Sequence, residues 1–312
     1  MRTVIVHYHI YKNAGTSFDH VLQHNFGDRV ESFDGPYPFF TIDQEQLDRI
    51  ILRRPAAVAF SSHQVILPAP SSLDYRTLSA IFVRNPFLRI ASIYRFKRGP
   101  ETVDGVPIGL LPAEDRVPAL ELAGLAPELA DHIDTTATAE AARGHDFAGW
   151  VEHCLTTPAE AVHVSNAQTR FFASVHRQRP LIRRSVAGLV YDLAAAFRNL
   201  SAIELLGRTE HFETDVARFA DILADHGITL ALPEDTRKNV TQHHESTISE
   251  RVEALLAPLP APLRERLQAA NAQDVALYDR ACQLIERDHR ILHARPFSSP
   301  SAPAPRRSRW PR

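Results

Sequence analysis

One short stretch near the start of the chain, Lys12-Asn13-Ala14-Gly15-Thr16-Ser17, combines a cation, small residues and two hydroxyls. A small-residue loop that leads into a helix directs backbone N–H groups and the helix N-terminus towards one point, where an anion is stabilised. Lys12 adds a mobile cation, and Thr16 and Ser17 add hydroxyl donors in the first helical turn. This combination predicts an anion-binding loop.

The residues around this loop predict a strand before it and a helix after it. Residues 4–9 alternate in a β-branched and aromatic run, and Phe18, Val21 and Leu22 recur at helical spacing. The loop differs from a Walker A motif, GxxxxGK[ST], in which the lysine follows the last glycine. Here Lys12 comes before Gly15.

A second stretch, Ile81–Phe96, places an arginine where a strand should end. Residues 79–84 read as a strand that ends at Arg84, and Asn85-Pro86 is a typical helix start. Ser92 follows eight residues after the arginine. A guanidinium and a hydroxyl suit a phosphate dianion. Alternatively, Arg84 pairs with a nearby carboxylate and Ser92 is a small packing residue.

Together, the two stretches resemble sulfotransferases that use 3′-phosphoadenosine 5′-phosphosulfate. The K-x-x-G-T-S order resembles the 5′-phosphosulfate loop of that family. V-R-N-P followed by R-x-x-S-x-Y-R resembles its 3′-phosphate element, and the separation of about seventy residues also matches. The resemblance implies adenosine 3′,5′-bisphosphate as the product and no metal. The residues it assigns to the nucleotide are Lys12, Asn13, Ala14, Gly15, Thr16, Ser17, Arg84 and Ser92.

Three later segments extend the resemblance over roughly residues 3–290. Residues 204–212 resemble a G-x-T-E-x-F turn, and residues 274–279 resemble a D-x-x-L-Y-[DE] helix start. Residues 166–170 resemble the N-x-Q-[TV]-R segment of the branch that includes heparan sulfate 2-O- and 6-O-sulfotransferases. This branch implies a carbohydrate or glycolipid acceptor. The family also closes a loop over the nucleotide, here Arg237, Lys238 and Asn239, which can equally be read as a solvated charged turn.

A hydroxyl acceptor needs a base, and His63 is the candidate. It follows a predicted strand over residues 56–61, at the same sheet edge as Lys12, and relatives in the branch use a histidine in this region. Histidine suits proton transfer near neutral pH. The alternative is an ordinary surface or core histidine among the 16 in the chain. His7 and His9 lie on the first strand and are expected to pack or to orient neighbours.

Strands that alternate with helices predict a parallel sheet, so the fold class is α/β, P-loop-NTPase-like, with a helical insertion and a helical C-terminal part. We expect one domain over residues 1–294, with residues 99–146 as the insertion. Residues 295–312 are rich in Pro, Ser and Arg and are expected to be disordered. Residues 26–41 read as a loop, 73–78 as a connector, and 263–288 as helical.

Composition narrows the function classes. The net charge of −2 gives no sign of a nucleic-acid partner, and two distant cysteines suit a reducing compartment. We find no signal peptide or long apolar run, which predicts a cytoplasmic, bacterial enzyme. Two other functions stay open. One is a P-loop nucleotide kinase or phosphoryl transferase, although the Gly-Lys-Ser order is missing. The other is a non-catalytic nucleotide-binding protein.

Overall fold

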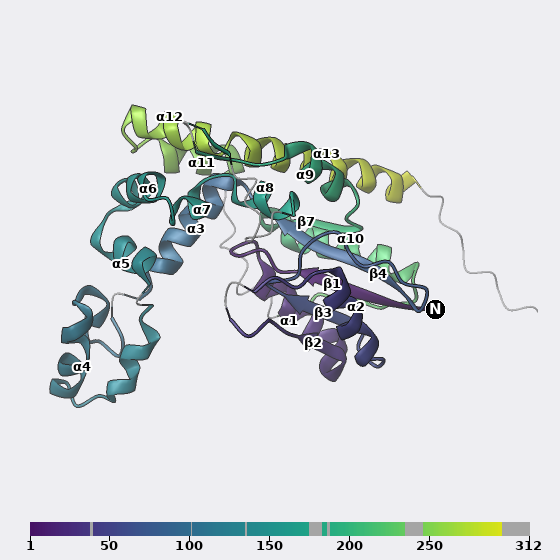
Figure 1. Cartoon of the computed structure of the whole chain (residues 1–312), viewed down its shortest axis with the longest axis horizontal. Helices are drawn as coiled ribbons and strands as arrows, with labels where there is room; N and C mark the ends of the chain where they lie inside the picture. The colour runs from purple at the N-terminus through teal and green to yellow at the C-terminus, as the bar shows by residue number, and fades with distance from the viewer. Residues whose placement is uncertain are drawn as a thin grey trace, which may run out of the picture.

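Five parallel strands form the central sheet, in the order β2-β3-β1-β4-β7 (Figure 1). In this computed structural model the described residues are 1–37, 40–100, 102–134, 136–174, 183–185, 188–234 and 246–294. The strands of the sheet are β1 Arg2–Tyr8, β2 Val30–Ser32, β3 Ala59–Ser62, β4 Tyr75–Val83 and β7 Leu205–Arg208. A separate antiparallel pair is formed by β5 Arg183–Ser185 and β6 Gly188–Val190. The predicted α/β class is confirmed.

Helices cover both faces of the sheet. One face carries α1 Gly15–Phe26 and α10 Phe212–Ala224. The other face packs against α2 Gln44–Arg53, α8 Ala167–Phe172, α9 Leu193–Ser201 and α13 Ala272–Ala294. The remaining α-helices are α3 Pro86–Arg98, α4 Ala113–Leu122, α5 Ala137–Gly144, α6 Phe147–Thr156, α7 Ala161–Val164, α11 Ile248–Leu256 and α12 Ala261–Ala270.

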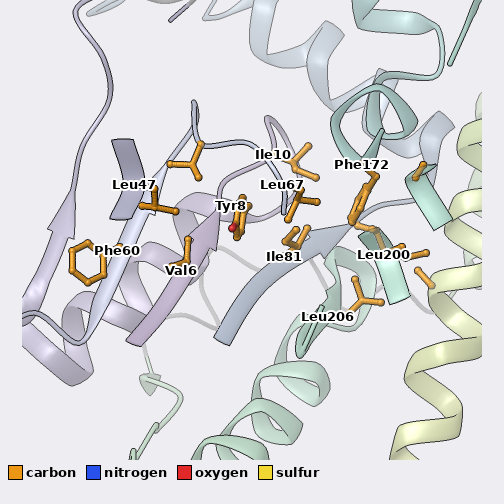
Figure 2. Packing of buried hydrophobic residues seen from close by; sticks show 14 of the residues in the cluster. Val6, Tyr8, Ile10, Leu47, Phe60, Leu67, Ile81, Phe172, Leu200 and Leu206 are labelled. Carbon is orange, nitrogen blue, oxygen red and sulfur yellow. The ribbon is translucent and has the colours of Figure 1, made fainter. Parts of the chain in front are cut away.

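Strand β1 is buried on both faces, because it lies in the middle of the sheet. Val6 and Tyr8 point into the core under α2, α8 and α9, together with Ile81 of β4 (Figure 2). Ile5 and His7 point to the opposite face, where Phe18 of α1 packs edge-on against the His7 ring. This alternation places the odd-numbered residues of β1 beside α1.

Two details of the expected element order were wrong. The loop expected over residues 26–41 contains β2, a short edge strand whose polar residues conceal it. Strand β4 begins at Tyr75, inside the expected connector. The sequence pattern missed its first residues because Arg76 and Thr77 interrupt the apolar run. The region 263–288 is helical as expected, in two helices separated at Asn271, whose side chain donates to the carbonyls of Val164 and Leu267.

Short helices make up the expected insertion. After α3 the chain forms a small cluster around Ile108, Leu120 and Ile133, with α4 at the end of an arm that extends away from the sheet (Figure 1). Helix α5 then returns to pack against α3. Residues 295–312, for which disorder is expected, lie outside the described residues.

Candidate functional site

The loop between β1 and α1 has an unusual backbone. Lys12 and Ala14 both adopt positive φ angles, of 65° and 62°. Asn13 between them is buried, and its Nδ2 donates to the Phe82 carbonyl at 2.9 Å and to Oε1 of Gln168 at 2.7 Å. The Asn13 side chain therefore anchors the loop to β4 and α8. Its role towards a nucleotide stays a prediction, and so does that of the Ala14 backbone.

Gly15 begins α1, and the absence of a side chain there leaves room for His9. A Cβ atom on Gly15 would lie 1.9 Å from Cδ2 of His9 and 2.2 Å from its Nε2. Thr16 is exposed and Ser17 is half-buried in the first turn of the helix. Both hydroxyls lie at the helix N-terminus, where an anion would be stabilised, and their role towards a phosphate stays a prediction.

Arg84 follows β4 and reaches the lysine loop directly. Its Nη1 donates to the Lys12 carbonyl at 3.0 Å, which joins two segments 72 residues apart. Gln168 fastens the same junction: its Oε1 accepts from the Arg84 amide at 2.9 Å, and its Nε2 donates to the Arg84 carbonyl at 2.8 Å. The same Oε1 accepts from Asn13. One buried amide therefore holds both predicted phosphate-binding segments in a fixed relation.

Glu210, just after β7, supports Arg84 from the other side. Its carboxylate accepts from the Asn85 amide at 3.0 Å and from the Tyr278 hydroxyl at 3.1 Å. The Arg84 Nε lies 4.0 Å from Oε1 of Glu210. Arg84 thus has the carboxylate that the packing alternative requires, at the outer limit of an ion pair.

Positive charge is nevertheless in excess at this junction. Burial lowers the pKa of Arg84 to about 10; Glu210 opposes that shift, while Arg95, Arg251 and Arg89 add to it. Burial and then the Arg84 and Arg95 charges lower the pKa of Lys12. Among the described residues, the buried Nε of Arg84 has no hydrogen-bond partner. A bound anion can relieve this repulsion.

Helix α3 starts as the sequence predicts. The Asn85 side chain accepts from the amides of Phe87 and Leu88, and Pro86 occupies the first turn. Ser92 is half-buried on this helix. Arg237, Lys238 and Asn239 lie outside the described residues.

A cleft of about 870 Å³ opens beside the lysine loop and reaches His63. The Nδ1 of His63 lies 3.2 Å from the His9 carbonyl, and the two imidazole rings contact each other at a tilt of 36° with centroids 3.8 Å apart. Loss of solvation, and secondly His9, lower the pKa of His63, whereas Asp34 raises it. The cleft walls are rich in aromatic and cationic side chains, including Tyr11, Tyr37, Phe40, Phe96, Phe171, Arg89, Lys97, His163 and Arg170.

Lys12 borders this cleft. Its Nζ lies 4.2 Å from the centroid of the Phe96 ring, and both Tyr11 and Phe96 line the cleft. The structure therefore brings Lys12 and Arg84 into direct contact and leaves His63 in the cleft next to the lysine loop. The carboxyl ends of parallel strands meet at one edge of the sheet, where ligands of open α/β sheets bind.

His7, His9 and Asp19 form a further cluster behind the loop. Their candidate ligand atoms lie within 4.8 Å of one another, a spacing that a metal ion can bridge. His7 and His9 were expected to pack or orient neighbours, and both hydrogen bond to Asp19. The absence of a metal stays a prediction.

Sequence reasoning missed the buried residues that hold the site together. Gln168 and Glu210 lie in segments that carry the family resemblance, but the motif alone gave them no role. The side chains of Asn166 and Asp274 each accept hydrogen bonds at the start of the other's helix. Asn166 accepts from the Asp274 amide, and Asp274 accepts from the amides of Gln168 and Thr169. The sequence did contain a signal for Asp19. Asp19 lies one helical turn after Gly15, and His7 and His9 are two residues apart, as are neighbours on one face of a strand.

A five-stranded parallel sheet covered by helices on both faces is consistent with a P-loop-like α/β fold. The family described as "Sulfotransferase family" matches residues 1–279, so the chain belongs to the sulfotransferase family. A protein from Archaeoglobus fulgidus, described as uncharacterized, is 25% identical over 294 residues, which cover 91% of this chain and 98% of that protein. Among the described helices, none is long and apolar enough to cross a membrane.

Proposed function

We propose that the protein transfers a sulfuryl group from 3′-phosphoadenosine 5′-phosphosulfate to a hydroxyl of a carbohydrate or glycolipid. The observation that carries this proposal is the contact between Arg84 and the Lys12 carbonyl. It puts a guanidinium that suits a 3′-phosphate beside a loop that suits a 5′-phosphosulfate. Family membership supports sulfuryl transfer, and the crowding of Lys12 and Arg84 favours a ligand with more than one negative charge.

In the proposed reaction, the acceptor oxygen forms a bond to sulfur while the bond from sulfur to the 5′-phosphate oxygen breaks. The acceptor proton moves to Nε2 of His63, and adenosine 3′,5′-bisphosphate leaves. Negative charge grows on the 5′-phosphate, where Lys12, the loop amides and the N-terminus of α1 stabilise it. Lys12 therefore acts mainly on the transition state.

His63 has the tautomer that this step requires. A carbonyl oxygen only accepts hydrogen bonds, so the contact with the His9 carbonyl places the proton of neutral His63 on Nδ1. Its Nε2 then carries the free lone pair. The lowered pKa keeps the imidazole neutral, and so able to accept a proton, at neutral pH.

The cleft walls support a sugar acceptor. Aromatic rings such as Tyr37 and Phe171 offer flat apolar surfaces, and cations such as Arg170 offer hydrogen-bond donors. Lys97 is already engaged, because its Nζ lies 2.8 Å from Asp134. Its charge is therefore partly neutralised by the insertion.

The test is a transfer assay with 3′-phosphoadenosine 5′-[³⁵S]phosphosulfate and a panel of oligosaccharides and glycolipids. We expect label in one acceptor class and release of adenosine 3′,5′-bisphosphate, unchanged by EDTA. A nucleotide kinase would instead transfer phosphate from ATP and require magnesium. A binding protein would hold the nucleotide without turnover, and either result would overturn the proposal.

A further inference from the structure

Asp19 on α1 contacts three side chains: His7 on β1, His9 just after β1, and Ser61 on β3. Nδ1 of His7 lies 2.7 Å from its Oδ1, Nδ1 of His9 lies 2.9 Å from its Oδ2, and the Ser61 hydroxyl donates to Oδ1 at 2.5 Å. Burial raises the pKa of the Asp19 carboxyl, but the hydrogen bonds from His7 and His9 outweigh it and hold the pKa far below its ordinary value. An ionised carboxylate only accepts hydrogen bonds, so Nδ1 of His9 carries a proton.

His9 in turn makes two contacts with His63. Its ring packs against the His63 ring in a tilted arrangement with an interplanar angle of 36°, and its carbonyl accepts from Nδ1 of His63. These contacts fix both the orientation of the His63 ring and its tautomer. Because His63 itself is exposed at the cleft, the buried His9 provides the rigid wall against which it packs.

Gly15 connects this arrangement to the lysine loop. The His9 ring occupies the volume that any Cβ at Gly15 would require. The loop glycine therefore serves the histidines as well as the approach of a phosphate, and the position of His9 is set jointly by Asp19 and by the start of α1.

We propose that Asp19 and His9 form a positioning pair for His63: Asp19 fixes His9, and His9 fixes His63 with Nε2 free towards the cleft. The catalytic meaning of this pair rests on the proposed function, in which His63 is the base. The positioning itself is a property of the free protein, so it can be tested without any substrate.

Several charges face the His63 ring. His9 lowers its pKa, and the carboxylates of Asp34 and Asp19 raise it. Replacing Asp19 by asparagine removes one anion, so the pKa of His63 should fall, and the proton on Nδ1 of His9 should no longer be fixed. Other titratable or cationic groups on the cleft walls are Arg89, Lys97, His163 and Arg170.

The experiment is a pH titration of histidine side chains by long-range ¹H–¹⁵N NMR, with His63→Ala and His9→Phe for assignment. In the unmodified protein we expect His9 and neutral His63 both to carry the proton on Nδ1. In Asp19→Asn we expect the pKa of His63 to fall, because an anion that raises it is removed, and His9 to populate both tautomers. His24→Gln, at an exposed position of the same helix, should change neither. An Nε2-protonated His9, or an unchanged His63 in Asp19→Asn, would overturn the proposal.

A second variant keeps the proposal testable if Asp19→Asn does not fold. His9→Phe retains a ring under His63 but loses the link to Asp19, so kcat should fall about tenfold while adenosine 3′,5′-bisphosphate binds normally. Full activity with an unchanged His63 tautomer would show that a ring packed against His63 positions it without the link to Asp19, and would overturn the proposal.

Zn²⁺ titrated into the free protein should leave the His9 resonances unchanged. Tight binding that displaces the His9 proton would make the cluster a metal site and contradict the pair.

Discussion

The two halves of the site are built differently. On the side proposed for the nucleotide, buried groups hold each other in place, since Gln168 joins Asn13 to Arg84, and Glu210 holds the start of α3. On the side proposed for the acceptor, His63 lies at an exposed position against the buried His9 ring, beside an open cleft. A rigid frame suits a ligand whose two phosphates lie at a fixed separation, whereas an acceptor needs room to enter and leave. We therefore expect mutations in the two halves to separate binding from turnover.

The largest effect is expected for His63→Ala. Loss of a general base typically costs about 10²–10⁴ in rate, and the nucleotide half should be untouched. Steady-state kinetics should show this loss in kcat, while calorimetry shows normal binding of adenosine 3′,5′-bisphosphate. His24→Ala, which removes an exposed histidine, is the control. Near-normal turnover in His63→Ala would show that another group acts as the base.

Lys12→Ala should lower kcat by about 10²–10³, because the charge that Lys12 stabilises develops mainly in the transition state. The affinity for the nucleotide product should change less. Arg49→Ala controls for the loss of one cation, since Arg49 lies exposed on α2. If only the Michaelis constant of the donor changed, Lys12 would be a binding residue and the comparison would fail.

Gln168→Leu tests the frame itself. The change leaves the amide and carbonyl of Arg84 without their side-chain partner and removes one of the two acceptors of Asn13 Nδ2. An unsatisfied buried polar group costs about 1–3 kcal/mol. We expect the affinity for adenosine 3′,5′-bisphosphate to fall by about tenfold or more. In a double-mutant cycle with Arg84→Ala, the two losses should be less than additive, because both act on the same junction. Strict additivity would separate Gln168 from Arg84.

The smallest expected effect is on pH dependence. His63 acts as a base only when it is neutral, and its pKa is lowered by loss of solvation and by His9. The rate should therefore fall as the pH falls through a value below the ordinary histidine pKa of about 6.5. The His63→Ala variant should lack this acid limb. A limb that persists in the variant would report a different group.

The difference between local sequence patterns and tertiary contacts explains which parts of the site the sequence could predict. Lys12, Gly15 and Arg84 lie in short local patterns, a strand end followed by a helix start, and such patterns can be recognised without knowing the fold. Gln168, Glu210 and Asp274 act across 68 to 155 residues of sequence. Their partners are set by tertiary packing, so no local spacing reveals them. Strand β2 was missed for a related reason, because a short edge strand needs little apolar sequence.

The central claim is that Arg84 and the Lys12 loop together bind a nucleotide with phosphates at both the 3′ and 5′ positions. Calorimetric titration of adenosine 3′,5′-bisphosphate against adenosine 5′-monophosphate tests it most directly. We predict much tighter binding of the bisphosphate, and a loss of about tenfold or more of that preference in Arg84→Ala, since a charged hydrogen bond contributes about 1.5–3 kcal/mol. Arg208→Ala, at the end of the neighbouring strand and paired with Asp215, should keep the preference. Equal affinity of the unmodified protein for the two nucleotides would contradict the account.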